Sequence, residues 1–149
     1  MDKRVVITGL GAITPIGKNV EENWNSIKEK KCGIDEITLF NTENFKTKLA
    51  AEVKEYNPLE HFEAKQAKRL DRYSQFAIIA TREAVKSSEI SKENTDFNRV
   101  GIFVSSGIGG LTTIQEQCRI DNEKGNKRVS PMFIPMSIAN MAAGNIAIE

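Results

Sequence analysis

The stretch from Val100 to Leu111, VGIFVSSGIGGL, constrains the fold more than any other part of this sequence. It opens with an apolar run, the pattern of a strand that is buried on both faces of a sheet. Serines and three glycines follow, and glycine lets the backbone turn tightly or another group approach closely. Leu111, Ile114 and Cys118 then recur at helical spacing, so we predict a helix that begins near Gly110. A buried strand, a glycine turn and a helix together indicate an α/β fold, in which such turns hold ligands.

The composition is that of an ordinary globular domain. The 149 residues carry a net charge of +1, with 28% charged and 40% hydrophobic residues. Neither nucleic acid nor a membrane is therefore predicted as a partner, and an electrostatic partner must be recruited by local patches. No apolar run is long enough to span a membrane, and the first residues do not resemble a signal peptide.

Residue types that often carry chemistry are scarce and scattered. Cys32 and Cys118 form neither a CxxC pair nor a metal-ligand spacing, so two free thiols in a reducing cytosol are predicted. His61 is the only histidine, and no acidic residue lies at helical spacing to orient it. We interpret His61 as a surface residue and expect neither a metal nor a cofactor.

The chain opens with a predicted buried strand over residues 4–8 and a glycine turn after it. Gly9 and Gly11 match the first two glycines of a dinucleotide-binding fingerprint. The third position of that fingerprint holds Thr14, and Pro15 stands where the phosphate-binding helix would begin. A nucleotide-binding α/β domain is therefore a distant alternative, and a tight turn that leaves an inner strand is favoured.

Capping residues and apolar spacing predict the next elements. Asn19 can cap a helix that places Trp24 on its buried face and ends near Gly33. A strand is predicted over residues 49–53. Asn57, which is followed by proline, is typical of the cap of a short helix.

Residues 63–72 form a local basic cluster, with four basic and two acidic residues and a net charge of +2. The basic residues fall at i, i+3, i+4 and i+7, on one face of a predicted helix: Lys65, Lys68, Arg69 and Arg72. Such a face is either solvated or docks an acidic partner. A long helix with an apolar stripe that starts at Tyr73 is predicted to follow.

The C-terminal part changes abruptly from polar to apolar. In residues 129–136, VSPMFIPM, two prolines bracket three large apolar residues in a run that is too short to predict a helix. Exposure of this loop would be unfavourable, so we expect it to be buried in the domain or against another subunit. Ser137 is predicted to cap a last helix, in which the sequence stops at Glu149 without a C-cap signal. We interpret that end as the sign of a fragment.

Several of these blocks resemble one enzyme family. Residues 4–11 and 14–17, RVVITGLG and TPIG, are similar to the opening of β-ketoacyl-acyl-carrier-protein synthases. Residues 106–111, 130–135 and 140–144, SGIGGL, SPMFIP and NMAAG, resemble later blocks of the same enzymes. The blocks follow the family's order across nearly the whole chain, and the pattern is closest to the synthase II branch of type II fatty-acid synthesis.

The resemblance implies a thiolase-like fold, which has two similar α/β halves in αβαβα layers and forms a tight homodimer. Residues 1–149 would be the N-terminal portion of the first half. It also implies a cytoplasmic acyltransferase that performs a decarboxylative Claisen condensation of an acyl thioester with malonyl-acyl-carrier protein. This chemistry needs an activated cysteine thiolate, an oxyanion hole and histidines that stabilise the enolate.

No catalytic residue of the family falls within these 149 residues. The resemblance places the nucleophilic cysteine after the next strand, beyond Glu149, and the two histidines further on. Cys32, Cys118 and His61 match none of them, so the chain alone is expected to be inactive. A carrier-protein-binding partner without chemistry, similar to a chain-length factor, remains an alternative, and the residue at the nucleophile position would distinguish the two.

The resemblance does assign binding surfaces. Ile108 corresponds to the residue that gates the inner acyl pocket. Phe133 and Ile134 correspond to pocket lining that is delivered across the dimer interface. The following residues correspond to, or extend, the basic surface that meets acyl carrier protein: Lys65, Lys68, Arg69, Lys127 and Arg128.

Overall fold

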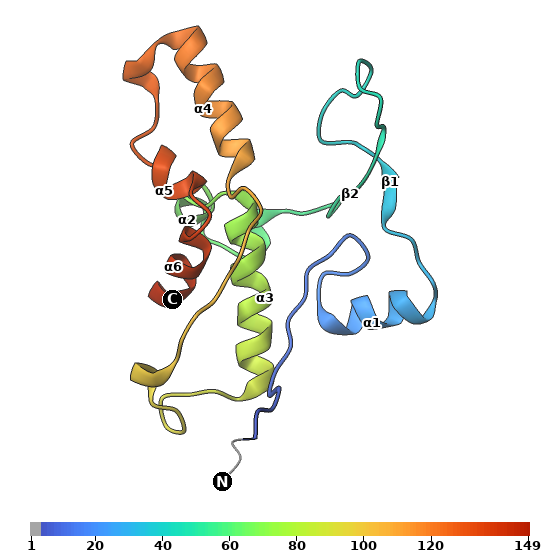
Figure 1. Cartoon of the computed structure of the whole chain (residues 1–149), viewed down its shortest axis with the longest axis vertical. Coiled ribbons are helices and arrows are strands. Elements are labelled where there is room, and N and C mark those ends of the chain that lie inside the picture. Colours follow the sequence, from blue (N-terminus) through green and yellow to red (C-terminus); the bar gives the residue numbers. More distant parts are fainter. Residues whose placement is uncertain (1–3) are drawn as a thin grey trace. The chain divides into compact units, whose positions relative to one another are not determined.

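The computed structural model describes residues 4–149, which divide into two compact units (Figure 1). Unit 1 consists of residues 4–56 and 82–89, and unit 2 of residues 57–81 and 90–149. Helix α3 (Arg72–Ser88) begins in unit 2 and ends in unit 1. It confirms the long helix that was predicted from the apolar stripe starting at Tyr73.

Unit 1 contains helix α1 (Val20–Lys28) and a two-stranded antiparallel sheet. The strands are β1 (Ile34–Glu36) and β2 (Leu49–Ala51), so the strand predicted over residues 49–53 is confirmed for its first three residues. The predicted N-cap of α1 is also confirmed, because the side chain of Asn19 accepts a hydrogen bond from the backbone N–H of Glu22 at 2.8 Å.

Helix α1 does not end at Gly33 as predicted. Its left-handed residue is Lys30, with φ of 57°. The backbone N–H groups of Lys30 and Lys31 donate to the carbonyls of Ile27 and Ser26 at 3.0 and 2.9 Å, the paired bonds of a Schellman motif. The helix therefore closes three residues before the glycine.

The buried face of α1 is polar, so the prediction of a buried Trp24 is wrong. Trp24 is 59% exposed, whereas Asn23 and Ser26 are buried. Their side chains donate to the carbonyls of Gly17 and Ile16 at 3.0 and 2.6 Å. The helix packs on a turn whose carbonyls need donors, and this favours polar side chains at the contact.

The glycine turn after residue 8 serves packing in unit 1. A Cβ on Gly9 would overlap the backbone of α3 at Ala84 and Ser88. Residues 14–17 form the predicted tight turn, with paired backbone hydrogen bonds of 2.8 and 3.2 Å. No helix begins here before α1, so within residues 4–149 the arrangement of a dinucleotide-binding turn is absent.

The buried strands predicted over residues 4–8 and 100–104 do not form in the described residues. Ile7 and Phe103 are 82% and 96% exposed, and neither segment pairs with a neighbour. A strand forms when its backbone bonds to an adjacent strand, and the sheet of the described chain consists of β1 and β2. The apolar patterns are present, but residues 4–149 place no pairing strand beside them.

Unit 2 is helical. Its elements are η1 (Pro58–Glu60), α2 (Ala64–Ala67), η2 (Phe97–Arg99), α4 (Leu111–Lys124), η3 (Asn126–Arg128), α5 (Phe133–Ser137) and α6 (Met141–Ile148), together with the first part of α3. Two predicted helix starts are confirmed. The side chain of Asn57 accepts from the N–H of Leu59 at 3.1 Å, and α4 follows Gly110 directly.

The single helix predicted through residues 63–72 is broken. Helix α2 ends at Ala67 and α3 begins at Arg72, because Asp71 stands before α3 and accepts a hydrogen bond from the N–H of Tyr73 at 3.2 Å. The four basic residues therefore do not share one helical face.

The apolar segment after residue 129 contains a short helix, contrary to prediction. Helix α5 accommodates Pro135 because proline is tolerated in a first helical turn, where its missing N–H is not needed. Ser137 is the last residue of α5 and not the cap of α6, which follows Asn140.

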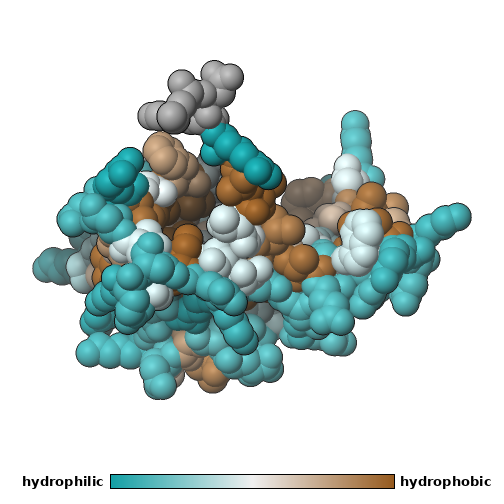
Figure 2. All heavy atoms as spheres, turned by 90° about the horizontal axis from the view of Figure 1, so that it is seen from below, coloured by the Kyte–Doolittle hydropathy of each residue, from teal (hydrophilic) through white to brown (hydrophobic). Residues whose placement is uncertain are grey.

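The hydrophobic core of unit 2 is small. Phe62, Leu70 and Ile78 are its buried members, and Ile146 of α6 packs against them. Many apolar side chains reach the surface elsewhere in the chain (Figure 2). His61 is half-buried, so its interpretation as a surface residue holds only in part.

Two further expectations concern the whole chain. The predicted free thiols are confirmed, since Cys32 and Cys118 are both exposed and unpaired. Among residues 4–149, none of the helices is both long and apolar enough to cross a membrane.

Candidate functional site

The glycine turn before α4 packs backbone against backbone. Gly109 has φ of +92° and donates to the Ser106 hydroxyl at 2.9 Å, while the N–H of Gly110 donates to the carbonyl of Ser137 at 2.8 Å. A Cβ on Gly109 would overlap that carbonyl, and one on Gly110 would lie 2.5 Å from the carbonyl of Met136. The two glycines are therefore needed for close contact with the end of α5.

Ile108 projects from this turn without packing into a core. Its side chain is 63% exposed, and the space beside Gly107 is open. Within the described residues Ile108 is therefore not part of a hydrophobic core, and its role at an acyl pocket stays a prediction.

Helix α5 carries the other two predicted pocket residues. Ile134 is 57% exposed and Phe133 is half-buried, so burial of this segment within the domain is incomplete. The hydrogen bond between Gly110 and Ser137 joins α5 to the turn that carries Ile108. Two segments that are separate in the sequence thereby come together.

A buried polar junction that the sequence analysis missed lies behind the turn. Asp71 is 6% exposed, and its Oδ2 accepts hydrogen bonds from the hydroxyl and backbone N–H of Thr113 at 2.6 and 3.1 Å. The hydroxyl of Tyr73 donates to the carbonyl of Ile138 at 2.6 Å. An aspartate that directly precedes a helix is itself an N-cap signal, and Asp71 stands two residues before the stripe that starts at Tyr73.

The predicted basic residues fall on separate surfaces. Lys65 and Arg69 lie at a hollow of about 690 Å³ in unit 2, whose apolar part includes Leu70 and Ile78. Lys68 is exposed but does not line this hollow. Arg128 lines a different hollow, so the structure brings Lys65 and Arg69 to one hollow and Arg128 to another.

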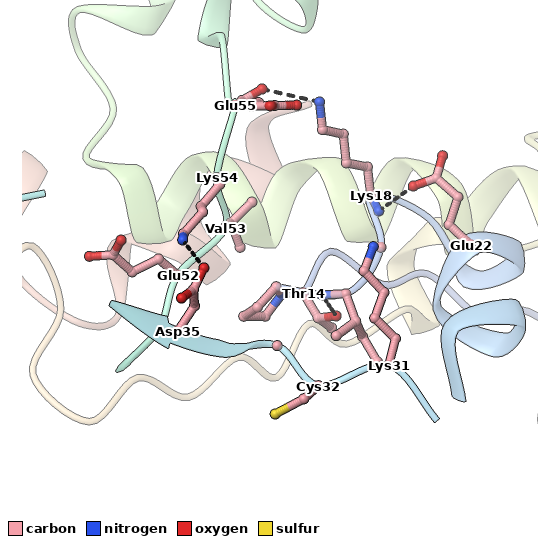
Figure 3. Close-up of a pocket in the computed structure, with 14 residues that line it drawn as sticks. Thr14, Lys18, Glu22, Lys31, Cys32, Asp35, Glu52, Val53, Lys54 and Glu55 are labelled. Atoms are coloured by element: carbon pink, nitrogen blue, oxygen red, sulfur yellow. Dashed lines mark hydrogen bonds and ion pairs between the residues drawn. The ribbon is translucent and has the colours of Figure 1, made fainter. Parts of the chain in front are cut away.

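A third hollow, in unit 1, is charged but satisfied by its own residues (Figure 3). Lys54 forms an ion pair with Asp35 at 2.6 Å, and Lys18 donates to the carbonyl of Glu55 at 3.1 Å. The hydrogen bond from Lys54 holds the pKa of Asp35 below its usual value, and Asp35 in turn raises the pKa of Lys54. These contacts tie together the loops that line the hollow.

No metal centre is found in the part of the chain that the structure describes, where no three potential ligand side chains come together. The geometry instead offers an exposed apolar turn, a helix joined to it, and exposed cations. A profile of the family described as "Beta-ketoacyl synthase, N-terminal domain" matches residues 2–149. The chain belongs to the β-ketoacyl synthase family.

Relatives in this family are similar along the whole chain. The 3-oxoacyl-[acyl-carrier-protein] synthase 2 of Staphylococcus aureus (strain N315) is 43% identical over 148 residues, 99% of this chain and 36% of that protein. The synthase 2 of Synechocystis is 40% identical over 147 residues, 99% of this chain and 35% of that protein. The chain thus spans about a third of the length of these curated relatives.

Solved ketosynthases share the fold. The ishigamide ketosynthase/chain length factor matches with a TM-score of 0.83 and 26% identity, covering 97% of this chain and 36% of that one. A type II polyketide acyl-carrier protein in complex with its ketosynthase, bound to the hexaketide, matches with a TM-score of 0.79 and 23% identity, covering 99% and 38%. The thiolase-like α/β class that the sequence resemblance implied is therefore confirmed.

Proposed function

We propose that these residues form the N-terminal part of a 3-oxoacyl-[acyl-carrier-protein] synthase of type II fatty-acid synthesis. The identity of 43% to a synthase 2 across 99% of the chain carries this proposal. The complete enzyme would be a cytoplasmic homodimer that needs no cofactor. Residues 1–149 would be the first portion of its first thiolase-like half.

In this reaction an acyl group passes from a thioester to an enzyme cysteine, and the carrier thiol leaves. Malonyl-acyl-carrier protein then loses CO₂, its carbanion attacks the enzyme thioester, and the cysteine thiolate is released. The described residues would contribute binding to these steps, because the family's nucleophile lies beyond Glu149.

The acyl chain would lie against Ile108, Phe133 and Ile134. Ile108 and Ile134 are exposed and Phe133 is half-buried, and contact with them would stabilise a hydrocarbon chain by about 0.8 kcal/mol for each methylene removed from water. The exposure of Ile108 on a turn with backbone held at Gly109 and Gly110 supports a pocket wall that an acyl chain could reach.

Acyl carrier protein would dock on the exposed cations Lys65, Lys68 and Arg69, with Lys127 and Arg128 as further contacts. Among the residues that the structure describes, no carboxylate pairs with Lys65, Lys68 or Arg69. Unpaired cations at the rim of a hollow suit an acidic protein partner, mainly by accelerating its association.

The test is a hybrid synthase in which residues 2–149 replace the aligned segment of the Staphylococcus aureus relative. The hybrid is expected to release CO₂ from malonyl-acyl-carrier protein and to form the β-ketoacyl product, whereas the 149-residue chain alone is expected to form none. Circular dichroism and a cooperative melting curve establish that the hybrid is folded. Binding of acyl carrier protein is measured separately by titration.

The outcomes separate the candidate functions. A folded hybrid that binds acyl carrier protein without making product would contradict the condensing role and favour the non-catalytic, chain-length-factor-like alternative. A folded hybrid that neither binds nor reacts would refute both. Turnover by the 149-residue chain that depends on Cys118 would contradict the assignment of the nucleophile to a position beyond Glu149.

A further inference from the structure

Three segments of unit 2 meet at one buried carboxylate. Asp71 precedes α3, and Thr113 lies in the first turn of α4. The Gly109–Gly110 backbone, which directly precedes α4, packs on the end of α5. The carboxylate of Asp71 is the acceptor that joins the start of α3 to the start of α4. A Cβ added to Gly110 would lie 2.9 Å from its Oδ2, which shows how closely the turn is packed against Asp71.

Hydrogen bonds from Thr113 and Tyr73 hold the carboxylate of Asp71 in place. Oδ2 accepts from the Thr113 hydroxyl at 2.6 Å and from its N–H at 3.1 Å, and Oδ1 accepts from the N–H of Tyr73 at 3.2 Å. In the described chain Asp71 forms no ion pair, so these donors are what compensate its burial. Removal of the hydroxyl donor would leave the buried carboxylate under-satisfied, and the first turn of α4 would be held to α3 by the backbone bond alone.

The side chain of Ile108 has little packing of its own, so its place is set through the backbone. The N–H of Gly110 ties the turn to the carbonyl of Ser137. The first turn of α4, which follows directly, is tied to Asp71 through the hydroxyl of Thr113. We propose that Asp71, through Thr113, is a positioning residue that fixes the Gly107–Gly110 turn and so sets which acyl chain lengths can pass Ile108. This inference rests on the proposed function.

Thr113→Val tests the junction with the least change of shape. Valine is close to isosteric with threonine, keeps the backbone hydrogen bond to Asp71 and removes the hydroxyl donor. Thr113→Ser restores a hydroxyl. The matched control is Thr112→Val, because Thr112 is the exposed neighbour in the same turn and its hydroxyl has no partner in the described chain.

The readout is kcat/KM of the hybrid synthase for a series of acyl primers. A looser turn lets Ile108 move aside more easily, so Thr113→Val is expected to raise the long-to-short primer ratio about fivefold, the scale of one lost hydrogen bond. Thr113→Ser is expected to return the ratio to the parent value, and Thr112→Val to leave it unchanged. Thr113→Ala makes the same deletion if the valine variant does not fold.

Loss of stability alone is controlled by Ile79→Val, since Ile79 packs against the core of unit 2 and is not part of the junction. This variant is expected to lower the melting temperature without changing the primer ratio. An unchanged or reduced ratio in Thr113→Val, or a uniform loss that matches Ile79→Val, overturns the inference. The parent hybrid is assayed first. If it is folded but inactive, the result contradicts the proposed function and not the role of Asp71.

Discussion

The backbone N–H of Val20 donates to the carboxylate of Glu83 at 2.9 Å, so the end of α3 provides an acceptor for the start of α1. The second oxygen of Glu83 accepts from the N–H of Ala12, also at 2.9 Å. The first N–H groups of a helix have no partner within the helix, and here one of them is satisfied by a residue 63 positions away. One side chain thus holds both ends of the segment between residues 12 and 20.

We predict that Glu83→Ala destabilises the 149-residue chain by about 2–4 kcal/mol, because two hydrogen bonds to a charged acceptor are lost together. Urea unfolding measures the change in the free energy of unfolding. Glu29→Gln is the control, since Glu29 is exposed at the end of α1, and we expect it to stay within about 0.5 kcal/mol of the parent. Equal stability of the two variants would show that the Glu83 contacts contribute nothing.

Three glycine-to-alanine variants separate backbone strain from close packing. Gly109 has a positive φ and faces the carbonyl of Ser137, Gly125 has a positive φ in open space, and Gly107 has open space without a positive φ. We predict almost no loss of stability for Gly107→Ala and about 1–3 kcal/mol for Gly125→Ala, the usual range for strained backbone. Gly109→Ala is expected to lose more than Gly125→Ala, and thermal melts of the three variants establish the order.

Local signals account for the elements that the sequence predicted well. Asn19 caps α1, Gly110 precedes α4, and the stripe that starts at Tyr73 marks α3. Each signal acts within about one turn of the chain, so a single sequence contains it.

Features that depend on distant partners were not predictable. Residues 4–8 carry a strand pattern but have no adjacent strand in the described chain. Asp71 and Thr113 lie 42 positions apart, and nothing local to either indicates the other. The motif around Ile108 was enough to predict its role from the resemblance to the family. The junction of Asp71 with Thr113, which holds the turn of Ile108, could be identified only in the three-dimensional structure.

The hairpin loop of unit 1 is predicted to weaken at acid pH. Glu52 accepts hydrogen bonds from the N–H and hydroxyl of Thr38 at 2.9 and 2.8 Å, and the backbone bond is the main cause that holds its pKa below the usual 4.5. A lowered folded-state pKa contributes stability above pH 4.5 that is lost as the pH falls through the folded-state value. Amide exchange at Thr38, corrected for intrinsic rates, should therefore accelerate over this range.

The matched variants for this prediction are Glu52→Gln and Glu43→Gln. The first should show exchange at Thr38 that does not change with pH, because an amide side chain does not titrate in this range. The second should behave like the parent, since Glu43 is exposed in the same loop and its carboxylate makes no hydrogen bond in the described chain. Protection at Thr38 that does not change with pH in the parent would refute the role of Glu52.

Charge reversal tests the proposed carrier surface. In the hybrid synthase, Lys68→Glu combined with Arg69→Glu should raise KM for acyl-carrier-protein substrates about tenfold at low salt, because steering by surface charges acts on association. The dependence of kcat/KM on salt should become flatter. Lys92→Glu, at an exposed cation outside the proposed surface, should change neither quantity. A salt dependence that is unchanged in the double variant would show that the two cations are only solvated.

Ile108→Phe tests the pocket wall itself. If acyl chains pass Ile108, the larger ring should block long primers in the hybrid synthase while short primers still react, because each excluded methylene forfeits about 0.8 kcal/mol of burial. The turn that carries the side chain is held at Gly110 by the hydrogen bond to Ser137, so its backbone resists a shift that would make way for the ring. If Ile108 instead becomes a plain core residue in the complete enzyme, overpacking should lower stability by about 1–3 kcal/mol and reduce kcat/KM alike for every primer. Profiles of kcat/KM against primer length, with a melting curve for each variant, distinguish the two roles. Ile90→Phe is the control for an equal change in side-chain size. A loss of kcat/KM that is uniform across primers and follows the melting temperature would remove Ile108 from the acyl pocket.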